Sequence, residues 1–459
     1  MRQTASLETI MNSINDTIAA RATPEGKGGI GVIRISGKKA AYAAEKVAGK
    51  LPAPREAAYL PLTDREGRTV DHGIVIYFQG PRSYTGEDVT EIQCHGGQFV
   101  IDMLLEHVLS LDGIRMAEPG EFTKRAFLNG KLDLTEAEAV ADLIDASSRE
   151  AARSAANSLS GAFSGIVDAL TERLTKLRAY VEASLDFPDE DIDFMKEGEV
   201  LQKIRKLEED VKEAFEEARQ GVILKDGMNL VIAGRPNAGK SSLLNLLAGS
   251  DRAIVTDIAG TTRDLIESDV SLDGLTLHVT DTAGLHESDD TVEKIGIDRA
   301  WNAIRRADHI IYMIDSSAGL TDDDREFLSE MPEDRSITVV LNKIDKGDRS
   351  ALEGSGYTVI PVSIKTGEGI GDLKEHLKKS LGYRGAGEGS FTARRRHLDA
   401  LERTLSHLKS AEENAGSGIA PELAAEELRL AQNELGEITG KVTSDDLLGV
   451  IFSTFCIGK

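Results

Sequence analysis

A glycine-rich segment, residues 234–241, constrains the fold of this 459-residue chain more than any other feature. It reads Gly-Arg-Pro-Asn-Ala-Gly-Lys-Ser and matches the phosphate-loop pattern G-x-x-x-x-G-K-[ST]. The apolar residues 230–233 before it predict a buried strand, and residues 242–247 after it predict a helix. A phosphate bound there meets inward-turned backbone N–H groups and a helix N-terminus. This context predicts a site for a nucleoside triphosphate and disfavours a glycine-rich turn with a chance lysine.

The residue types of the loop fit triphosphate chemistry. Lys240 can reach the β- and γ-phosphates, and the hydroxyl of Ser241 can ligate Mg²⁺. We expect the phosphate contacts to come from Asn237, Ala238, Gly239, Lys240, Ser241 and Ser242.

Composition narrows the class of protein. Lys+Arg number 54 and Asp+Glu 78, which gives a net charge of −24. Such a surface repels phosphate backbones at long range, so any contact with nucleic acid must be a local patch. Two cysteines, Cys94 and Cys456, argue against a disulfide framework and against a zinc site. There is no apolar run long enough to span a membrane and no signal core in residues 1–15, so a cytoplasmic location is the default expectation.

The texture of the chain changes three times and predicts a multidomain α/β and α+β protein. Residues 1–120 read as an α+β domain, with strands over 31–36 and 73–78 and helices over 40–48 and 100–109. Residues 121–226 read as helical, 227–383 alternate strands and helices, and 384–459 are helical again. Alternation is typical of a parallel sheet with crossover helices. We therefore expect the α/β domain to be inserted into one helical domain formed by 121–226 and 384–459.

The helical segments carry their own signals. An apolar stripe from Val200 to Ala218 predicts one long amphipathic helix, which Gly221 can close. The acidic residues 186–193 can be read as a metal site or as a solvated loop. Their spacing differs from a calcium loop, which favours the solvated loop. The main basic cluster, Arg394-Arg395-Arg396, fits a solvated helix start as well as an RNA contact.

Base specificity depends on two segments that follow predicted strands. Asn342-Lys343-Ile344-Asp345 follows the apolar residues 337–341. A carboxylate at Asp345 can accept both N1–H and N2–H of guanine, whereas adenine offers no such donor pair. Ser363, Ile364 and Lys365 follow another strand and can place backbone N–H groups near guanine O6. The base is therefore expected to be guanine and the nucleotide GTP.

Two further segments complete the expected nucleotide site. Asp281 ends a third strand and can orient Mg²⁺ through water, and the N–H of Gly284 can sense the γ-phosphate. Thr262 is placed to be the second Mg²⁺-ligating hydroxyl. Together the motifs resemble translation-factor-like GTPases. The remaining nucleotide contacts are expected from Thr256, Asp257, Ile258, Ala259, Gly260, Thr261, Thr282 and Ala283.

The residue after Gly284 leaves the group that orients the hydrolytic water unassigned. Leu285 stands where Ras-like GTPases carry a water-orienting glutamine, and leucine cannot perform that role. An arginine finger is one substitute, for which Arg263 is a local candidate. A bound cation that neutralises developing charge is the other.

Several long motifs in one order resemble the tRNA-modification GTPase family MnmE (TrmE). They are residues 22–24, 28–31, 83–88, 119–123, 143–146 and 455–459, together with the inserted GTP-binding domain. The resemblance implies a potassium-dependent GTPase whose GTP-binding domains pair head to head. It assigns the potassium ligands to Asn237, Thr256, Ile258 and Thr261, in place of an arginine finger. It assigns Glu293, which the residues alone favour as a surface glutamate, to positioning of the hydrolytic water.

The resemblance also implies a second site and partners. The N-terminal domain would dimerise and bind 5-formyl- or 5,10-methylene-tetrahydrofolate through Arg34, Glu91, Lys131 and Lys459. Without the family, Arg34 and Lys131 read as surface residues. An FAD-containing partner of the MnmG (GidA) type would complete a heterotetramer that modifies carbon 5 of the wobble uridine of certain tRNAs. The alternative is a GTPase switch in ribosome assembly without modification chemistry.

The two cysteines keep alternative readings. Cys456 can be a catalytic thiol, since the family shares it, or a packed terminal cysteine. Cys94-His95 can be an activated thiol pair, although a buried small residue before the Gly96-Gly97 turn is favoured. No role follows from the sequence for His286 or for residues 1–14.

Overall fold

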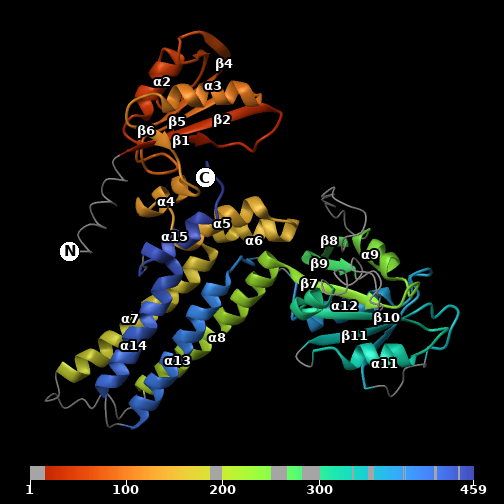
Figure 1. Cartoon of the computed structure of the whole chain (residues 1–459). Helices are drawn as coiled ribbons and strands as arrows, with labels where there is room; N and C mark the ends of the chain where they lie inside the picture. Colours follow the sequence, from red (N-terminus) through yellow and green to blue (C-terminus); the bar gives the residue numbers. More distant parts are fainter. Residues whose placement is uncertain are drawn as a thin grey trace. The chain divides into compact units, whose positions relative to one another are not determined.

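The computed structural model describes residues 16–186, 199–249, 266–281, 300–332, 335–349, 356–385, 387, 389–417, 421–442 and 445–458. The chain divides into two units, Met1–Ala141 with Gln432–Lys459, and Asp142–Ala431. Helix α5 (Leu134–Asp145) and helix α14 (Pro421–Thr439) each cross from one unit into the other. Figure 1 shows the elements of both units along the chain.

The first unit combines a mixed sheet with helices. Besides most of α5 it contains β1 (Thr17–Arg21), β2 (Gly28–Ser36), α2 (Ala40–Ala48), β3 (Ala57–Thr63), β4 (Thr69–Phe78), β5 (Val89–Gly96), α3 (Gln98–Leu109), β6 (Ile114–Met116), α4 (Glu121–Leu128) and α15 (Asp445–Ser453). These elements include the strands expected at 31–36 and 73–78 and the helices expected at 40–48 and 100–109.

The strands of the first unit follow the order β3-β4-β5-β2-β1-β6. Neighbours pair antiparallel except β1 and β6, which are parallel. Helices α2 and α3 cover one face of the sheet, where Ile33, Ile92, Ala44 and Leu104 are fully buried together (Figure 1). Alternation along the strands directs Arg34 and Glu91 to the opposite face, where polar groups remain near water.

The second unit contains long helices and an α/β domain. Its elements are α6 (Arg149–Leu159), α7 (Ala162–Asp186), α8 (Glu199–Asp226), β7 (Met228–Gly234), α9 (Lys240–Ala248), β8 (Ile266–Leu272), β9 (Leu275–Asp281), β10 (His309–Asp315), α11 (Asp322–Ser329), β11 (Ser336–Asn342), β12 (Thr358–Pro361), α12 (Ile370–Ser380) and α13 (Arg395–Ser417). The strand–helix alternation predicted for residues 227–383 is present in the described residues.

The sheet of the second unit has the order β12-β11-β10-β7-β9-β8. Its strands are parallel except β8, which pairs antiparallel with β9. Residues of α9 and α12 pack with Ile311 and Met313 on one face, and residues of α11 pack with Tyr312 and Ile314 on the other. A parallel sheet covered on both faces places the carboxyl ends of its strands at one edge, where ligands bind.

The prediction that Gly221 ends a helix is wrong. Helix α8 continues to Asp226, and the chain turns at Gly227, where φ is +66°. Gly221 is buried within the helix, where a Cβ atom would lie 2.7 Å from the carbonyl oxygen of Phe391. A residue with a side chain does not fit there, so this glycine serves close packing rather than helix termination.

The chain re-enters the helical part close to where it left. Helix α13 packs along α8, and the two lie side by side in Figure 1. Near the end of α8, Gln220 Nε2 donates to the carbonyl of Gly382 at 2.8 Å, and Gln220 Oε1 accepts from the N–H of Arg384 at 3.0 Å. The α/β domain is therefore inserted between two neighbouring points of the second unit.

The described residues contain no helix that is long and apolar enough to cross a membrane. Within the same residues, no group of His, Cys, Asp and Glu side chains is arranged to hold a metal ion. Most of the acidic segment 186–193 lies outside the described residues. Arg394 forms an ion pair with Asp142 at 2.7 Å, so part of the basic cluster at 394–396 serves internal packing.

Candidate nucleotide-binding site

The phosphate loop joins β7 to α9 as the motif predicts. Gly234 and Gly239 have φ angles of +139° and +107°, which side chains rarely adopt. A Cβ atom at Gly234 would lie 2.4 Å from the carbonyl oxygen of Met313, and one at Gly239 would lie 2.4 Å from Nδ2 of Asn342. Glycine is therefore required at both positions by conformation and by space.

The end of the loop is suited to an anion. Gly239 precedes the first residue of α9 and provides no side chain to cap its backbone N–H groups. Lys240 Nζ donates to the carbonyls of Gly234 at 2.7 Å and Arg235 at 3.1 Å. The lysine is 8% exposed, so its charge lies within the loop. Backbone N–H groups at a helix N-terminus, beside the cation of Lys240, together favour phosphate.

A second lysine, Lys343 directly after β11, holds the phosphate loop by a hydrogen bond. Lys343 Nζ donates to the carbonyl of Asn237 at 2.8 Å and to Oδ2 of Asp315 at 2.7 Å. Burial tends to raise the pKa of Asp315, but hydrogen bonds from Lys343 and Ser317 outweigh it and hold that pKa below its ordinary value. Asp315 is a site residue that the motifs missed. It follows the apolar residues 310–314 at the carboxyl end of β10, and this apolar run was the available signal.

Asn342 connects three motif segments. Its Nδ2 donates to the carbonyl of Ala238 at 2.8 Å, and its Oδ1 accepts from the N–H of Ile364 at 3.3 Å. The side chain is 3% exposed, so both bonds are made away from water. The asparagine thereby fixes the loop that binds phosphate relative to the segment expected near guanine O6.

Asp345 lies at the base end of the same site. The buried Ser363 hydroxyl donates to its Oδ1 at 2.9 Å. This bond orients the carboxylate and leaves Oδ2 and further lone pairs for a ligand. The arrangement suits a planar base that presents two adjacent N–H donors.

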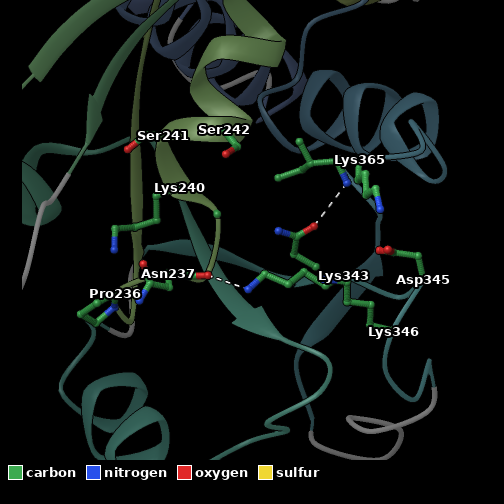
Figure 2. A pocket seen from close by; sticks show the side chains of 12 residues that line it. Pro236, Asn237, Lys240, Ser241, Ser242, Lys343, Asp345, Lys346 and Lys365 are labelled. Carbon is green, nitrogen blue, oxygen red and sulfur yellow. Dashed lines mark hydrogen bonds between the residues drawn. The ribbon is translucent and has the colours of Figure 1, made fainter.

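Residues of the phosphate loop and of the two base segments line one cavity of about 720 Å³. Figure 2 shows the lysines and Asp345 around it, with the bonds from Lys343 and to Asn342 dashed. The volume lies in the range of small-molecule and cofactor sites. The lining residues are Pro236, Asn237, Gly239, Lys240, Ser241, Ser242, Asn342, Lys343, Asp345, Lys346, Ile364 and Lys365. The structure thus brings together the phosphate-loop residues and the two base segments.

Other predicted contacts are only partly described. The backbone of Asp281 ends β9, as the sequence predicts, and pairs with Ile232, two residues before the start of the phosphate loop. Several predicted residues lie outside the described residues. They are Thr256, Asp257, Ile258, Ala259, Gly260, Thr261, Thr262, Thr282, Ala283, Gly284, Glu293 and Lys459, together with Arg263, Leu285 and His286.

The sheet face of the first unit brings together two residues of the second predicted site. Arg34 and Glu91 are register partners on β2 and β5 and form an ion pair at 2.9 Å. The guanidinium lies 5.2 Å from the ring centroid of Tyr84. Lys131 Nζ donates to the carbonyl of Pro81 at 3.2 Å, in the loop that also carries Tyr84. The pair is about one-fifth exposed and can share its hydrogen bonds with a polar ligand.

The two cysteines lie in different surroundings. Cys94 is buried, and burial together with the charge of Asp71 raises its pKa to about 11. Its neighbour His95 pairs with Asp71 at 2.8 Å. Cys94 is therefore not an activated thiol. Cys456 is exposed, and its carbonyl accepts from the N–H of Gly120 at 3.3 Å.

A phosphate loop at the carboxyl edge of a parallel sheet, beside an oriented carboxylate for the base, defines a P-loop nucleotide-binding protein. Two family models match the chain. They are the MnmE helical domain over residues 134–456 and the GTP-binding protein TrmE N-terminus over residues 17–131. The chain belongs to the MnmE (TrmE) family of tRNA modification GTPases.

Curated relatives agree with this assignment along their whole length. A tRNA modification GTPase MnmE of Erwinia tasmaniensis is 55% identical over 451 residues, 97% of this chain and 99% of the relative. One of Yersinia pseudotuberculosis is 55% identical over 456 residues, 97% of this chain and all of the relative.

Solved structures match a smaller share of the chain. Aquifex aeolicus Era bound to GDP and aluminium fluoride is 27% identical over 39% of this chain and 66% of that chain, with a TM-score of 0.29. The G domain of the T. maritima FeoB iron transporter is 30% identical over 33% of this chain and 98% of that chain, with a TM-score of 0.28. Scores this low carry no argument about function.

Proposed function

We propose that this chain hydrolyses GTP to GDP and phosphate in order to modify carbon 5 of the wobble uridine of certain tRNAs. The observation that carries the proposal is the match to tRNA modification GTPases over 97% of the chain and 99% of the relative. The oriented Asp345 carboxylate, held by Ser363 at the base end of the cavity, supports guanine as the base. Nothing in the described residues favours the alternative, a GTPase switch in ribosome assembly.

In the proposed hydrolysis, water attacks the γ-phosphorus and the β,γ-bridging oxygen leaves with the GDP. Lys240 and the N–H groups at the start of α9 would stabilise the charge on the phosphate oxygens. The exposed Ser241 hydroxyl would ligate Mg²⁺, and Asp281 would orient the ion through water. Glu293 would help to position the attacking water.

Potassium is the proposed replacement for the missing glutamine and arginine finger. Asn237 has a φ of +66° at the tip of the phosphate loop, and its exposed side chain lines the cavity. Its amide oxygen is a hard ligand of the kind that alkali cations accept. Thr256, Ile258 and Thr261 would supply the other oxygens. The ion would place positive charge against the transferring phosphoryl group.

The one-carbon unit is proposed to come from a 5-formyl- or 5,10-methylene-tetrahydrofolate on the sheet face of the first unit. The chemistry of the residues there fits such a group. Glu91 can accept from pterin N–H groups, Arg34 and Lys131 can bind carboxylates, and the ring of Tyr84 lies beside Arg34. Lys459 would complete the set. Bound folate would supply the one-carbon unit, at the formate level in the 5-formyl form or at the formaldehyde level in the 5,10-methylene form. These residues would bind and orient the folate.

The assembly is proposed from the family. The chain would form a homodimer through its N-terminal part and join an FAD-containing MnmG (GidA)-type partner in the cytoplasm. The limits 1–120, 121–226, 227–383 and 384–459 are proposed for its functional domains. The dimer would bring two GTP-binding domains together during hydrolysis.

Mass analysis of tRNA nucleosides from a strain without this chain tests the proposal. The aminomethyl-type modification at carbon 5 of the wobble uridine should disappear and should return with the wild-type gene. Unchanged wobble nucleosides, together with altered ribosome profiles, would favour the ribosome-assembly switch instead.

A further inference from the structure

The turn between β8 and β9 is seated on the start of helix α6. Its two residues, Asp273 and Gly274, have φ angles of 49° and 92°, as in a tight two-residue hairpin turn. The Ser148 hydroxyl donates to the carbonyl of Gly274 at 3.0 Å. The hydroxyls of Ser147 and Thr276 are 2.9 Å apart. A Cβ atom at Gly274 would lie 2.5 Å from Cγ of Glu150, so the contact leaves no space for a side chain.

The same turn is held from a second side. Lys378 of α12 donates to Oδ2 of Asp273 at 2.8 Å, and Tyr383 donates to the carbonyl of Asp273 at 3.4 Å. The hydrogen bond from Lys378 lowers the pKa of Asp273, which keeps this pair charged. The start of α6 and helix α12, which lie far apart in the sequence, therefore both form hydrogen bonds to the β8–β9 turn.

The other end of the hairpin reaches the nucleotide site. Strand β9 runs from Leu275 to Asp281, and its last residue pairs with Ile232 just before the phosphate loop. Six residue steps at ~3.3 Å give a lever of about 20 Å. Leu277 and Val279 are fully buried between the two ends. Because packed interiors transmit displacement with little compression, this strand behaves as a stiff connection.

The middle of the strand is attached to helix α8. His278 Nδ1 lies 2.7 Å from Oδ1 of Asp269 on β8, and its Nε2 lies 3.0 Å from the carbonyl oxygen of Asp226, the last residue of α8. A Cβ atom at Gly227 would lie 2.7 Å from the same ring nitrogen, Nε2. The hairpin thus contacts the helical part of the second unit at its turn and at its centre.

We propose that Ser147 is a positioning residue for the nucleotide site and acts through the β8–β9 hairpin, which it contacts at Thr276. Docking of the turn sets the position of the Asp281 end of β9, and nucleotide binding at that end biases the docking in return. The two directions are equal in binding free energy, as linkage requires. The proposal rests on the proposed GTP site, because it needs a ligand at the end of β9.

A double variant, Ser147→Ala with Thr276→Val, breaks the hydroxyl contact at small structural cost. Thr276 is 3% exposed, and replacing both partners by apolar groups of similar shape leaves no unsatisfied buried hydroxyl. Thr171→Val is a matched control, because that hydroxyl donates only to the carbonyl of Val167 within its own helix. All measurements use the full chain.

Hydrogen exchange with and without GDP is the test. In wild type and in Thr171→Val, GDP should protect the phosphate-loop amides and also change exchange in α6, which lines none of the nucleotide cavity. In the double variant, phosphate-loop protection should remain while the change in α6 becomes smaller, because the Ser148 contact to the turn is still present. Because docking and nucleotide binding are linked, the Kd for GDP should also shift about two- to tenfold in the double variant.

The outcomes separate the two proposals. Phosphate-loop protection without any change in α6 of the wild type, or an α6 response that is undiminished in the double variant, overturns the positioning role. Absence of phosphate-loop protection in the wild type instead defeats the GTP site itself. A Kd for GDP that stays at the wild-type value in the double variant also counts against the positioning role.

Discussion

Replacing Asp345 by asparagine should exchange the base preference of the nucleotide site. In the structure, Ser363 donates to Oδ1 of Asp345 at 2.9 Å, and asparagine retains an acceptor there. Its amide nitrogen, however, would present donors to the N1–H and N2–H donors of guanine. Two hydrogen bonds to a charged acceptor are each worth about 1.5–3 kcal/mol, so the loss is about 3–6 kcal/mol. At ~1.4 kcal/mol per tenfold, GTP should bind about 10²–10⁴-fold more weakly.

Xanthine provides the complementary measurement. It carries an oxygen where guanine carries the 2-amino group, so the asparagine amide can donate to it. Titration calorimetry with GDP and xanthosine diphosphate should show that Asp345→Asn prefers xanthosine. Asp372→Asn, an exposed carboxylate on α12 outside the cavity, is the matched control and should bind GDP as the wild type does. Equal GDP affinity in wild type and Asp345→Asn would refute the assignment of the base.

Four further predictions follow from the same structure. GTP hydrolysis should be at least about tenfold faster in K⁺ than in Na⁺ if a cation replaces the arginine finger, and equal rates in the two salts would exclude that role. Calorimetry with 5-formyl-tetrahydrofolate should show much weaker binding to Arg34→Ala than to the wild type. Arg65 is an exposed arginine in the β3–β4 turn, and the control Arg65→Ala should bind normally. Undiminished binding to Arg34→Ala counts against the site. Gly227→Ala should lower the free energy of unfolding by about 1–3 kcal/mol in chemical denaturation, because φ is +66° and a Cβ would meet His278. The control Gly371→Ala, at an exposed helix position with open space, should be neutral or slightly stabilising. Burial opposes the charge of His278, but hydrogen bonds to Asp269 and Asp226 raise its pKa. Its contribution to the free energy of unfolding is therefore complete below about pH 6.5 and is lost as pH rises through the raised pKa. The difference in Tm between wild type and a His278→Gln variant should therefore shrink at alkaline pH, and a constant difference would contradict the argument.

The parts of the site that local sequence rules describe were predictable. The phosphate loop needs glycines in left-handed conformations between a strand and a helix, and Gly234 and Gly239 have them. The proximity of Asp345 and Ser363 also followed, because parallel strands end at one edge of their sheet.

Features that depend on tertiary packing were not predictable in the same way. Gly221 looked like a helix terminator, yet it lies inside α8 because the chain at Phe391 passes against it. Asp315 had no motif, since its role comes from the lysine of another strand. The docking of the β8–β9 turn on α6 joins residues more than 120 positions apart and leaves no periodic signal.

The central claim is that the guanine-nucleotide site of this chain serves tRNA modification. The most direct measurement is mass analysis of wobble-uridine nucleosides in a strain that lacks the chain and is complemented with wild type, Asp345→Asn or Asp372→Asn. Wild type and Asp372→Asn should restore the carbon-5 modification, and Asp345→Asn should not. Full restoration by Asp345→Asn, with its GTP binding shown to be lost, would contradict the account.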